Sequence, residues 1–397
     1  MRADAGGLAL PLTVTLAVQT LAAFAIYCAP VMAPVAALAL GVSPAAVGYY
    51  IAATYLGSMV GSAASGGWMA RFGPIRVSQA GLVLCLAGLG LAATAWLPLV
   101  VLGGFVVGLG YGPATPASSV ILVRAAPPAM FSLVFSVKQT GVPGGGVLAG
   151  LIVPSLILAV GWQWAAVAIG VTCLALAFAI EPVRPRYDIG LKPEAPLTLA
   201  NAFAPVAMVV REPQLRKMCV CSFVYGGVQI TLVTYLVTFL IADFALSLVL
   251  AGVVMAVSQV ASVIGRVTWG VLADRLLSRR VMLGLLGIGM GVSALAALAA
   301  GPGWPAWLLF AYAAAFGATA VGWNGVFLAE VARMAPEGRT SEATGGTLFF
   351  TYLGVVITPL VFNTVLALSG TYSVAYAAFA VPSLAVGCWM LARMPSR

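Results

Sequence analysis

The sequence predicts an all-α membrane protein of twelve transmembrane helices in two pseudo-symmetric six-helix bundles. Hydrophobic residues make up 62% of the 397 residues, and charged residues only 7%, whereas soluble domains carry about 25% charged residues. Apolar stretches of membrane-spanning length recur along the whole chain, and two local sequence patterns recur in its second half. A transmembrane β-barrel is excluded, because its strands would alternate polar and apolar residues in short segments.

Twelve apolar spans can be drawn on the sequence. Each is long enough to cross about 30 Å of hydrocarbon at about 1.5 Å per residue. Their predicted bounds are 11–36, 44–69, 77–97, 99–124, 131–158, 161–181, 217–241, 246–272, 280–300, 304–331, 344–368 and 371–393.

The basic residues predict a multi-pass protein of the inner (plasma) membrane with both termini in the cytoplasm. Lys and Arg follow every second span, whereas the opposite loops contain neither, and their only charge is Asp243. This asymmetry is typical of cytoplasmic loops. The start, MRADAGG, leads directly into a long span, so no cleavable signal peptide is expected. The basic residues that follow spans 2, 4, 8 and 10 are Arg71, Arg76, Arg124, Arg275, Arg279, Arg280, Arg333 and Arg339.

The longest polar stretch, about 182–216, is interpreted as a cytoplasmic linker rich in charge and proline. It separates an N-terminal six-helix bundle at 1–181 from a C-terminal one at 217–397. Within the linker, the segment from Leu197 to Arg211 is expected to form a surface helix.

The two halves repeat a loop and a helix end. Residues 66–76 read GGWMARFGPIR and residues 270–280 read GVLADRLLSRR, an offset of 204 residues. Residues 123–127 read VRAAP and residues 332–336 read ARMAP, an offset of 209. Two separate patterns with nearly equal offsets indicate a duplication, and duplicated halves are common in secondary transporters.

Lys138 and Arg266 are the only Lys and Arg residues that fall inside apolar spans, and no Asp, Glu or His accompanies them at depth. A cation in hydrocarbon costs roughly 2.5–3.5 kcal/mol on insertion scales. We therefore expect the missing negative charge to arrive as the substrate, a small organic anion. The structural alternatives are an Arg266 that reaches toward the interface or bonds to backbone carbonyls, and a Lys138 bonded to carbonyls of a neighbouring helix.

The loop at 270–280 resembles the signature loop of the major facilitator superfamily, and the loop at 66–76 is a degraded copy with Ala70 in place of the family's usual Asp. The length, the spans and the linker agree, so the resemblance covers the whole chain and implies the fold of that superfamily. It also implies a cytoplasmic gate, in which Glu330 pairs with Arg275 or Arg279. The gating residues it implies are Asp274, Arg275, Arg279, Glu330 and Arg71.

A finer resemblance concerns Arg266. The run from Gly265 to Arg275 is similar to span 8 of oxalate/formate exchangers and monocarboxylate transporters. In those groups the Arg one turn before the Gly binds the substrate carboxylate, and a guanidinium suits such bidentate recognition. The resemblance further implies that spans 5 and 8 are neighbours, so that Lys138 and Arg266 face one cavity. Span 11 has no Lys like that of the oxalate exchangers.

Further polar and aromatic residues in the spans complete the predicted substrate site, although each alone is more often a helix-packing residue. The predicted substrate-binding residues are Arg266, Lys138, Gln139, Thr140, Gln229, Tyr225, Gln259, Asn324, Tyr352 and Tyr27. Gln19, Tyr111 and Trp323 are weaker candidates of the same kind.

The predicted function is secondary active transport of a small organic anion, a mono- or dicarboxylate, by alternating access. Coupling is left open between proton symport and exchange for a counter-anion. An exporter of drugs or other hydrophobic compounds is the first alternative, but it should carry embedded carboxylates, which the spans lack. A non-transporting membrane receptor is the second. The sequence has no His and no nucleotide-binding loop, so no enzyme, cofactor or metal site is expected. A monomer in the lipid bilayer without a nucleic-acid partner is expected.

Overall fold

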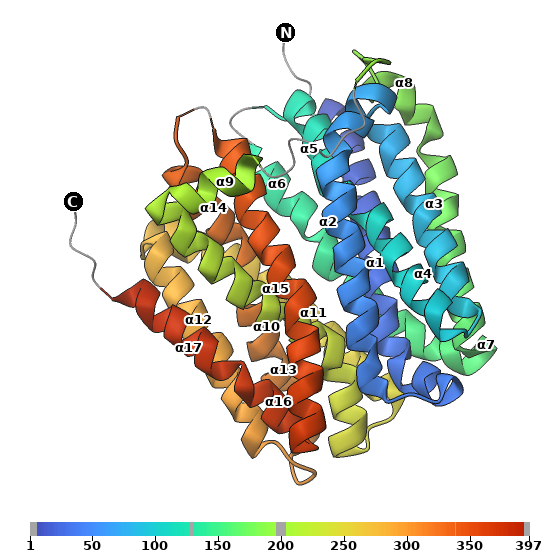
Figure 1. The fold of residues 1–397 in the computed structure, drawn as a ribbon, viewed down its shortest axis with the longest axis vertical. Coiled ribbons are helices and arrows are strands. Elements are labelled where there is room, and N and C mark those ends of the chain that lie inside the picture. The colour runs from blue at the N-terminus through green and yellow to red at the C-terminus, as the bar shows by residue number, and fades with distance from the viewer. Residues whose placement is uncertain (1–5, 128–130, 196–203, 338, 393–397) are drawn as a thin grey trace. The chain divides into compact units, whose positions relative to one another are not determined.

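Helices dominate the computed structural model, which describes residues 6–127, 131–195, 204–337 and 339–392 (Figure 1). Within these residues, ten helical stretches are long and apolar enough to cross a membrane. One of the ten, Val134–Tyr187, contains two of the predicted spans. The predicted span at 44–69 is not among the ten, because its helix is rich in Gly, Ser, Thr and Tyr. The count of twelve spans therefore stays a prediction.

The chain divides into two compact units, Met1–Ala202 and Phe203–Arg397. Residues 182–195 of the predicted linker belong to unit 1, and unit 2 begins with a short helix, α9, at Ala204–Arg211. That helix falls within the predicted surface helix, of which residues 197–203 lie outside the described residues.

Unit 1 is a bundle of long helices joined by short turns. Its helices are α1 (Gly6–Leu40), α2 (Val47–Phe72), α3 (Pro74–Ala93), α4 (Leu97–Tyr111), α5 (Ala114–Ala125), α6 (Phe131–Gln139), α7 (Gly141–Ala179) and α8 (Arg184–Tyr187), with 3₁₀ turns η1 (Pro44–Ala46) and η3 (Glu181–Val183).

Unit 2 repeats this construction. After α9, its helices are α10 (Pro213–Phe244), α11 (Leu248–Arg275), α12 (Arg279–Ala296), α13 (Ala306–Ala320), α14 (Asn324–Met334), α15 (Thr340–Ser369), α16 (Tyr372–Ala378) and α17 (Ala380–Leu391), with the 3₁₀ turn η4 (Ala297–Ala299).

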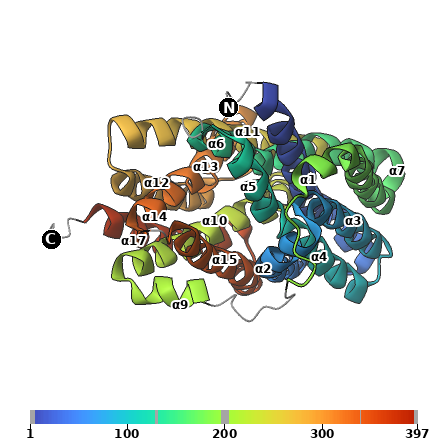
Figure 2. The same cartoon turned by 90° about the horizontal axis from the view of Figure 1, so that it is seen from above.

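The main helix pairs correspond between the units (Figures 1 and 2). In unit 1, α1 packs along α7, α2 along α4, and α3 along both α4 and α7. In unit 2, α10 packs along α15, α11 along α13, and α12 along α17 and less extensively along α13. Helix α7 takes part in two of these pairs because it turns sharply at Gly161, where φ is 80°. The same pairing order in both units supports the duplication inferred from the sequence.

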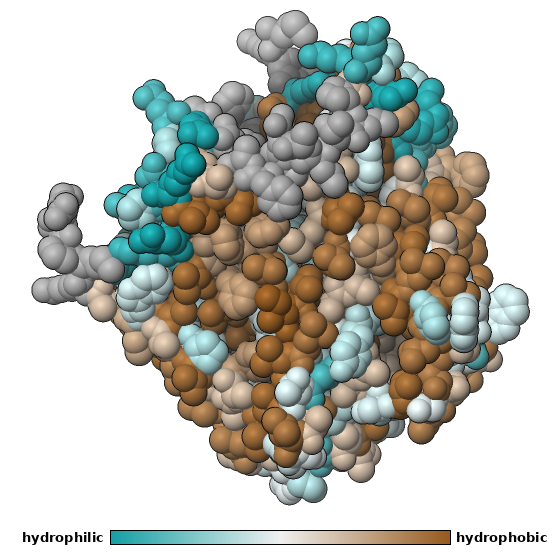
Figure 3. Space-filling model, in the orientation of Figure 1, coloured by the Kyte–Doolittle hydropathy of each residue, from teal (hydrophilic) through white to brown (hydrophobic). Residues whose placement is uncertain are grey.

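The helix flanks carry large apolar side chains on their outer surface (Figure 3). Phe178, Trp307 and Val381 are 71%, 68% and 71% exposed. In unit 1, hydrophilic side chains gather around α8 (Figure 3). Because a bilayer core solvates apolar but not polar side chains, this distribution suits a bundle surrounded by lipid.

Candidate functional site

Lys138 is the centre of a buried polar chain in unit 1. Its side chain, near the end of α6, is 1% exposed, and its Nζ donates to Oγ1 of Thr115 over 3.1 Å. Thr115 in turn donates to Oε1 of Gln19 on α1, also over 3.1 Å. No acidic side chain among the described residues pairs with Lys138. The buried ammonium therefore has a neutral hydrogen-bond partner.

The local backbone explains why these groups meet. Helix α4 ends at Tyr111 and α5 begins at Ala114, so the predicted fourth span is broken directly before Thr115. Such breaks at membrane depth are found where backbone lines a protein-enclosed site. Gln19 is fully buried, and its Nε2 has no partner among the described residues. One ammonium and one amide N–H₂ thus remain without an anionic or carbonyl acceptor.

Unit 2 has a similar break, between Ala320 at the end of α13 and Asn324 at the start of α14. There the Nε1 of Trp323 and the Nδ2 of Asn324 both donate over 3.0 Å to Oε1 of Gln229 on α10. Two predicted site residues, Gln229 and Asn324, are therefore in direct contact.

Arg266 of α11 reaches the same break. Its Nε donates to the carbonyl oxygen of Val321 over 3.2 Å, and its side chain is partly exposed. This bond is of the kind expected in the structural alternative for Arg266, and it engages one of the five guanidinium N–H groups. Within unit 2, Arg266 and Gln229 therefore bond to the two ends of the same four-residue segment, 321–324.

Gln259 and Ser262 lie on the face of α11 that also carries Arg266, at intervals of three and four residues. Gln259 is 1% exposed, and neither its Nε2 nor its Oε1 has a partner among the described residues. A buried amide with no partner is costly, so Gln259, like Gln19, carries unsatisfied amide atoms within the described part of the chain.

The remaining predicted site residues separate into different environments. Tyr225 is completely buried and donates to the carbonyl of Leu283 over 2.8 Å, a contact that holds α10 against α12. Its hydroxyl hydrogen is thereby engaged in helix packing and not directed to a substrate. Tyr27 is 2% exposed. Gln139 at the end of α6, Thr140 directly after it and Tyr352 in α15 are partly exposed.

The predicted gate residues pair differently from expectation. Asp274 accepts from Nη2 of Arg279 over 2.9 Å. Glu330, 2% exposed, forms a two-point contact with Arg333, at 2.7 and 2.9 Å. The partner of Glu330 is thus not Arg275 or Arg279, because Arg333 lies one turn away on the same helix.

The other two predicted gate residues, Arg71 and Arg275, are exposed at helix ends. The guanidinium of Arg71 lies 5.5 Å from the centre of the Phe72 ring.

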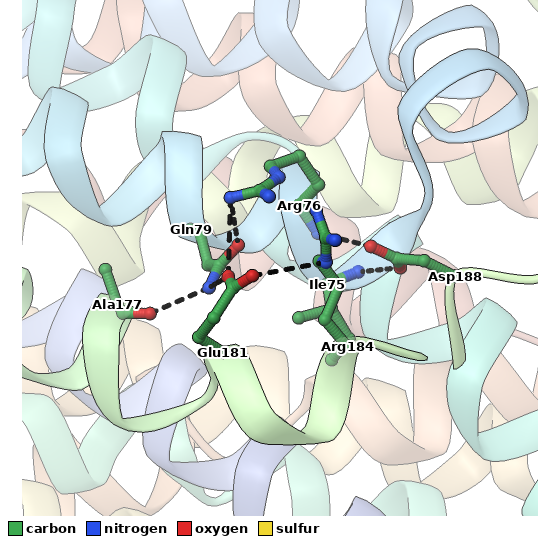
Figure 4. Close-up of polar contacts among 7 residues, drawn as sticks. All are labelled: Ile75, Arg76, Gln79, Ala177, Glu181, Arg184 and Asp188. Carbon is green, nitrogen blue, oxygen red and sulfur yellow. Dashed lines mark hydrogen bonds and ion pairs between the residues drawn. The ribbon is translucent and has the colours of Figure 1, made fainter. Parts of the chain in front are cut away.

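A cluster of polar contacts holds the start of the predicted linker against the loop between α2 and α3 (Figure 4). The carboxylate of Asp188 accepts from the backbone N of Ile75 at 2.8 Å and of Arg76 at 3.1 Å, and so caps α3. Glu181 accepts from Gln79 at 2.7 Å and from Arg76 at 3.3 Å. We call these contacts the linker clasp.

The linker clasp also contacts the loop that contains Ala70. The backbone N of Lys192 donates to the carbonyl of Ala70 over 2.7 Å, and a side chain at Gly73 would collide with the Asp188 carboxyl group. Asp188 therefore places a carboxylate beside this loop. Burial raises the pKa of Asp188 above its ordinary value, although the two backbone donors and the nearby arginines oppose this.

A large cavity of unit 1 is unsuited to an anion. It has a volume of about 350 Å³ and lies among α1, α2, α3, α4 and α7, near the helix ends opposite α8. Its lining contains no charged residue, and its aromatic members are Tyr49, Tyr50 and Trp162. The lining of this cavity offers no charged partner for an anion, unlike the buried Lys138.

Comparison with known proteins identifies the family. The model of the major facilitator superfamily matches residues 15–359 and 218–397. The chain belongs to the major facilitator superfamily. The repeated units and the broken helices described above agree with this membership. No protein with a curated description matches the sequence.

Solved transporter structures share the fold of this facilitator-superfamily protein. The nucleoside transporter NupG aligns over 96% of this chain and 99% of its own, with a TM-score of 0.77 and 15% identity. A POT family transporter in complex with 5-aminolevulinic acid aligns over 96% and 95%, with a TM-score of 0.75 and 12% identity. A D-xylose-proton symporter aligns over 96% and 96%, with a TM-score of 0.73 and 16% identity. At these identities the likeness concerns the fold alone.

Membership of the superfamily makes the chain a multi-pass membrane transporter by family and fold. Among the described residues, no group of three or more His, Cys, Asp or Glu could hold a metal ion. The sequence analysis did not select Thr115 or Asp188 as candidate site residues. The Gly-Pro pair before Ala114 could have indicated the helix break beside Thr115. No local pattern marked Asp188.

Proposed function

We propose that this facilitator-superfamily protein is a secondary active transporter of a small organic anion, a mono- or dicarboxylate, working by alternating access in the inner (plasma) membrane with both termini in the cytoplasm. The observation that carries the proposal is the Lys138–Thr115–Gln19 chain of unit 1. It contains a buried ammonium whose only hydrogen-bond partner among the described residues is the neutral Thr115 hydroxyl. A carboxylate supplies both the missing charge and the missing acceptors.

Arg266 offers the second cation in this proposal. Its Nε is bonded to the carbonyl of Val321, which fixes the guanidinium plane beside the break in α13–α14. In this proposal Arg266 binds the substrate carboxylate, because the planar guanidinium matches a carboxylate in bidentate geometry.

Proton symport and anion exchange are both compatible with this arrangement. The described spans carry no acidic residue beside Lys138 or Arg266 that would relay a proton. Export of a cationic drug is disfavoured for the same reason, because such a substrate needs a buried carboxylate. We propose that the protein acts as a monomer and without enzymatic chemistry.

The test is uptake by proteoliposomes across a panel of labelled mono- and dicarboxylates. Wild type is compared with Lys138→Met, which keeps the length of the side chain but removes its charge, and with Arg266→Ala. The control is Arg186→Ala, which removes an exposed cation of α8. We expect carboxylate uptake that falls at least tenfold in the first two variants and is retained in the control. Unchanged uptake in both site variants would refute the proposal.

A further inference from the structure

The two units contain the same hydrogen-bonded pair at equivalent positions of the repeat. Gln229 follows Gln19 by 210 residues, and Asn324 follows Thr115 by 209, close to the offsets of 204 and 209 that relate the repeated loops. In each unit the glutamine lies on the first long helix, and its Oε1 accepts from a residue directly after the helix break. The duplication has therefore preserved a contact as well as a fold.

The contact fixes the direction of each amide. An indole N–H can only donate, so the group of Gln229 that faces Trp323 is the oxygen. Its Nε2 must point away from the break. In unit 1, the Thr115 hydroxyl accepts from Lys138 and gives its hydrogen to Gln19, which turns the Nε2 of that glutamine away as well.

We propose that Gln19 in unit 1 and Gln229 in unit 2 are substrate-binding donors, with Thr115 and Trp323 as the positioning residues that set the direction of their amides. The proposal rests on the proposed function and deepens it. Each glutamine presents an N–H₂ group, so the substrate must offer oxygen acceptors and no donors at these points. Carboxylates meet this requirement, whereas amines and amides of similar shape do not.

The burial of Gln19 fits a residue that donates to the substrate in only part of the transport cycle. Gln19 is 0% exposed and its Nε2 is unpaired, whereas Gln229 is partly exposed. An unpaired buried donor carries a desolvation cost, which is relieved when the site opens and an acceptor binds. The opposing interpretation is that each glutamine only joins the first helix to the broken one, a structural role that uses the Oε1 and leaves the Nε2 idle.

Single substitutions separate these interpretations. Gln19→Met and Gln229→Met keep the length of the side chain and remove both the N–H₂ donor and the Oε1 acceptor. With a carboxylate that the wild type transports, we expect KM to rise about tenfold in each variant, because a hydrogen bond to a charged group is lost. A purely structural role instead predicts a lower unfolding temperature at an unchanged KM. The amide control is Gln163→Met on α7, which takes part in neither contact and should leave KM unchanged. Size-exclusion profiles of the detergent-solubilised variants report whether each is folded.

The positioning role is tested in unit 2, where the Nε1 of Trp323 donates directly to Oε1 of Gln229. Trp323→Phe retains an aromatic ring against Tyr225 and Phe327 but removes the indole N–H. We expect it to raise KM severalfold in the wild-type background and to have no further effect on KM in the Gln229→Met background. Equal effects in both backgrounds would assign Trp323 to packing alone.

The outcomes distinguish this inference from the proposed function. If Lys138→Met abolishes carboxylate uptake while both glutamine variants keep the wild-type KM, the glutamine assignment is wrong and the anion carrier stands. If the wild type takes up no carboxylate, the proposed function is wrong, and this inference is wrong with it.

Discussion

The Nζ of Lys138 lies 3.1 Å from the hydroxyl of Thr115, and this neutral group is the only hydrogen-bond partner of the ammonium among the described residues. One hydroxyl cannot compensate the loss of hydration of a buried cation. The fold therefore carries an unfavourable interaction that natural selection would remove unless it served transport. Such a residue is expected to trade stability for function.

Lys138→Met should stabilise the protein while it abolishes transport. Replacing a buried, poorly compensated cation by an apolar side chain of similar length removes its desolvation cost, and we expect a gain of about 1–3 kcal/mol. The measurement is thermal unfolding in detergent, with the exposed Lys192→Met as the charge-matched control. A Lys138→Met variant that unfolds at a lower temperature than wild type would show that the ammonium has a stabilising partner.

The Glu330–Arg333 pair should behave as a coupled unit. Glu330 is buried and Arg333 is 59% exposed in its side chain. Arg333→Ala leaves a buried carboxylate without its partner, and we expect a loss of about 1–3 kcal/mol after allowance for solvent screening of the exposed arginine. Adding Glu330→Gln should recover much of this loss. A double-mutant cycle followed by thermal unfolding measures the coupling, and strictly additive effects would contradict it.

The linker clasp should depend on the shape of Asp188 more than on its charge. Asp188→Ala removes both bonds to the start of α3, and loss of such a cap costs about 1–2 kcal/mol. Asp188→Asn retains an acceptor, and because burial raises the pKa of Asp188, loss of the charge is not expected to be severe. Limited proteolysis within residues 188–203 measures how firmly this segment is held. Equal protection of the Ala variant and wild type would show that the clasp is dispensable.

The sequence alone predicted the helical fold, the duplication and the family, because hydropathy and repeated loops are local signals. It also singled out Lys138, Gln229 and Asn324 as candidates, since polar residues in apolar spans are few, and their role in substrate binding stays a prediction. The contacts were beyond its reach. Thr115 links α1 to α6 through two side chains that lie far apart in the chain, and no local pattern reports such a relation.

The same limit explains the expectations that differ from the structure. Tyr225 was placed in the substrate site because it is polar at depth, but its hydroxyl bonds the backbone of a neighbouring helix. Glu330 was paired with arginines of another loop, whereas the arginine one turn away satisfies it. In both cases the polar group bonds to a partner other than the one expected from the sequence. For Tyr225 that partner is on a neighbouring helix, and for Glu330 it lies one turn away on the same helix.

Close packing of α2 against α4 should make Gly108 intolerant of any side chain. A Cβ at Gly108 would collide with the backbone oxygen of Thr54, which belongs to α2 and has no freedom to rotate away. Gly108→Ala must therefore separate the two helices, and we expect a loss of about 1–3 kcal/mol, typical of overpacking. The matched control is Gly90→Ala in α3, where a Cβ meets nothing within 4 Å. There the better helix propensity of Ala should be neutral or stabilise by up to about 1 kcal/mol. Thermal unfolding of both variants in detergent is the measurement, and equal stabilities would mean that α2 and α4 are not packed as closely as these contacts require.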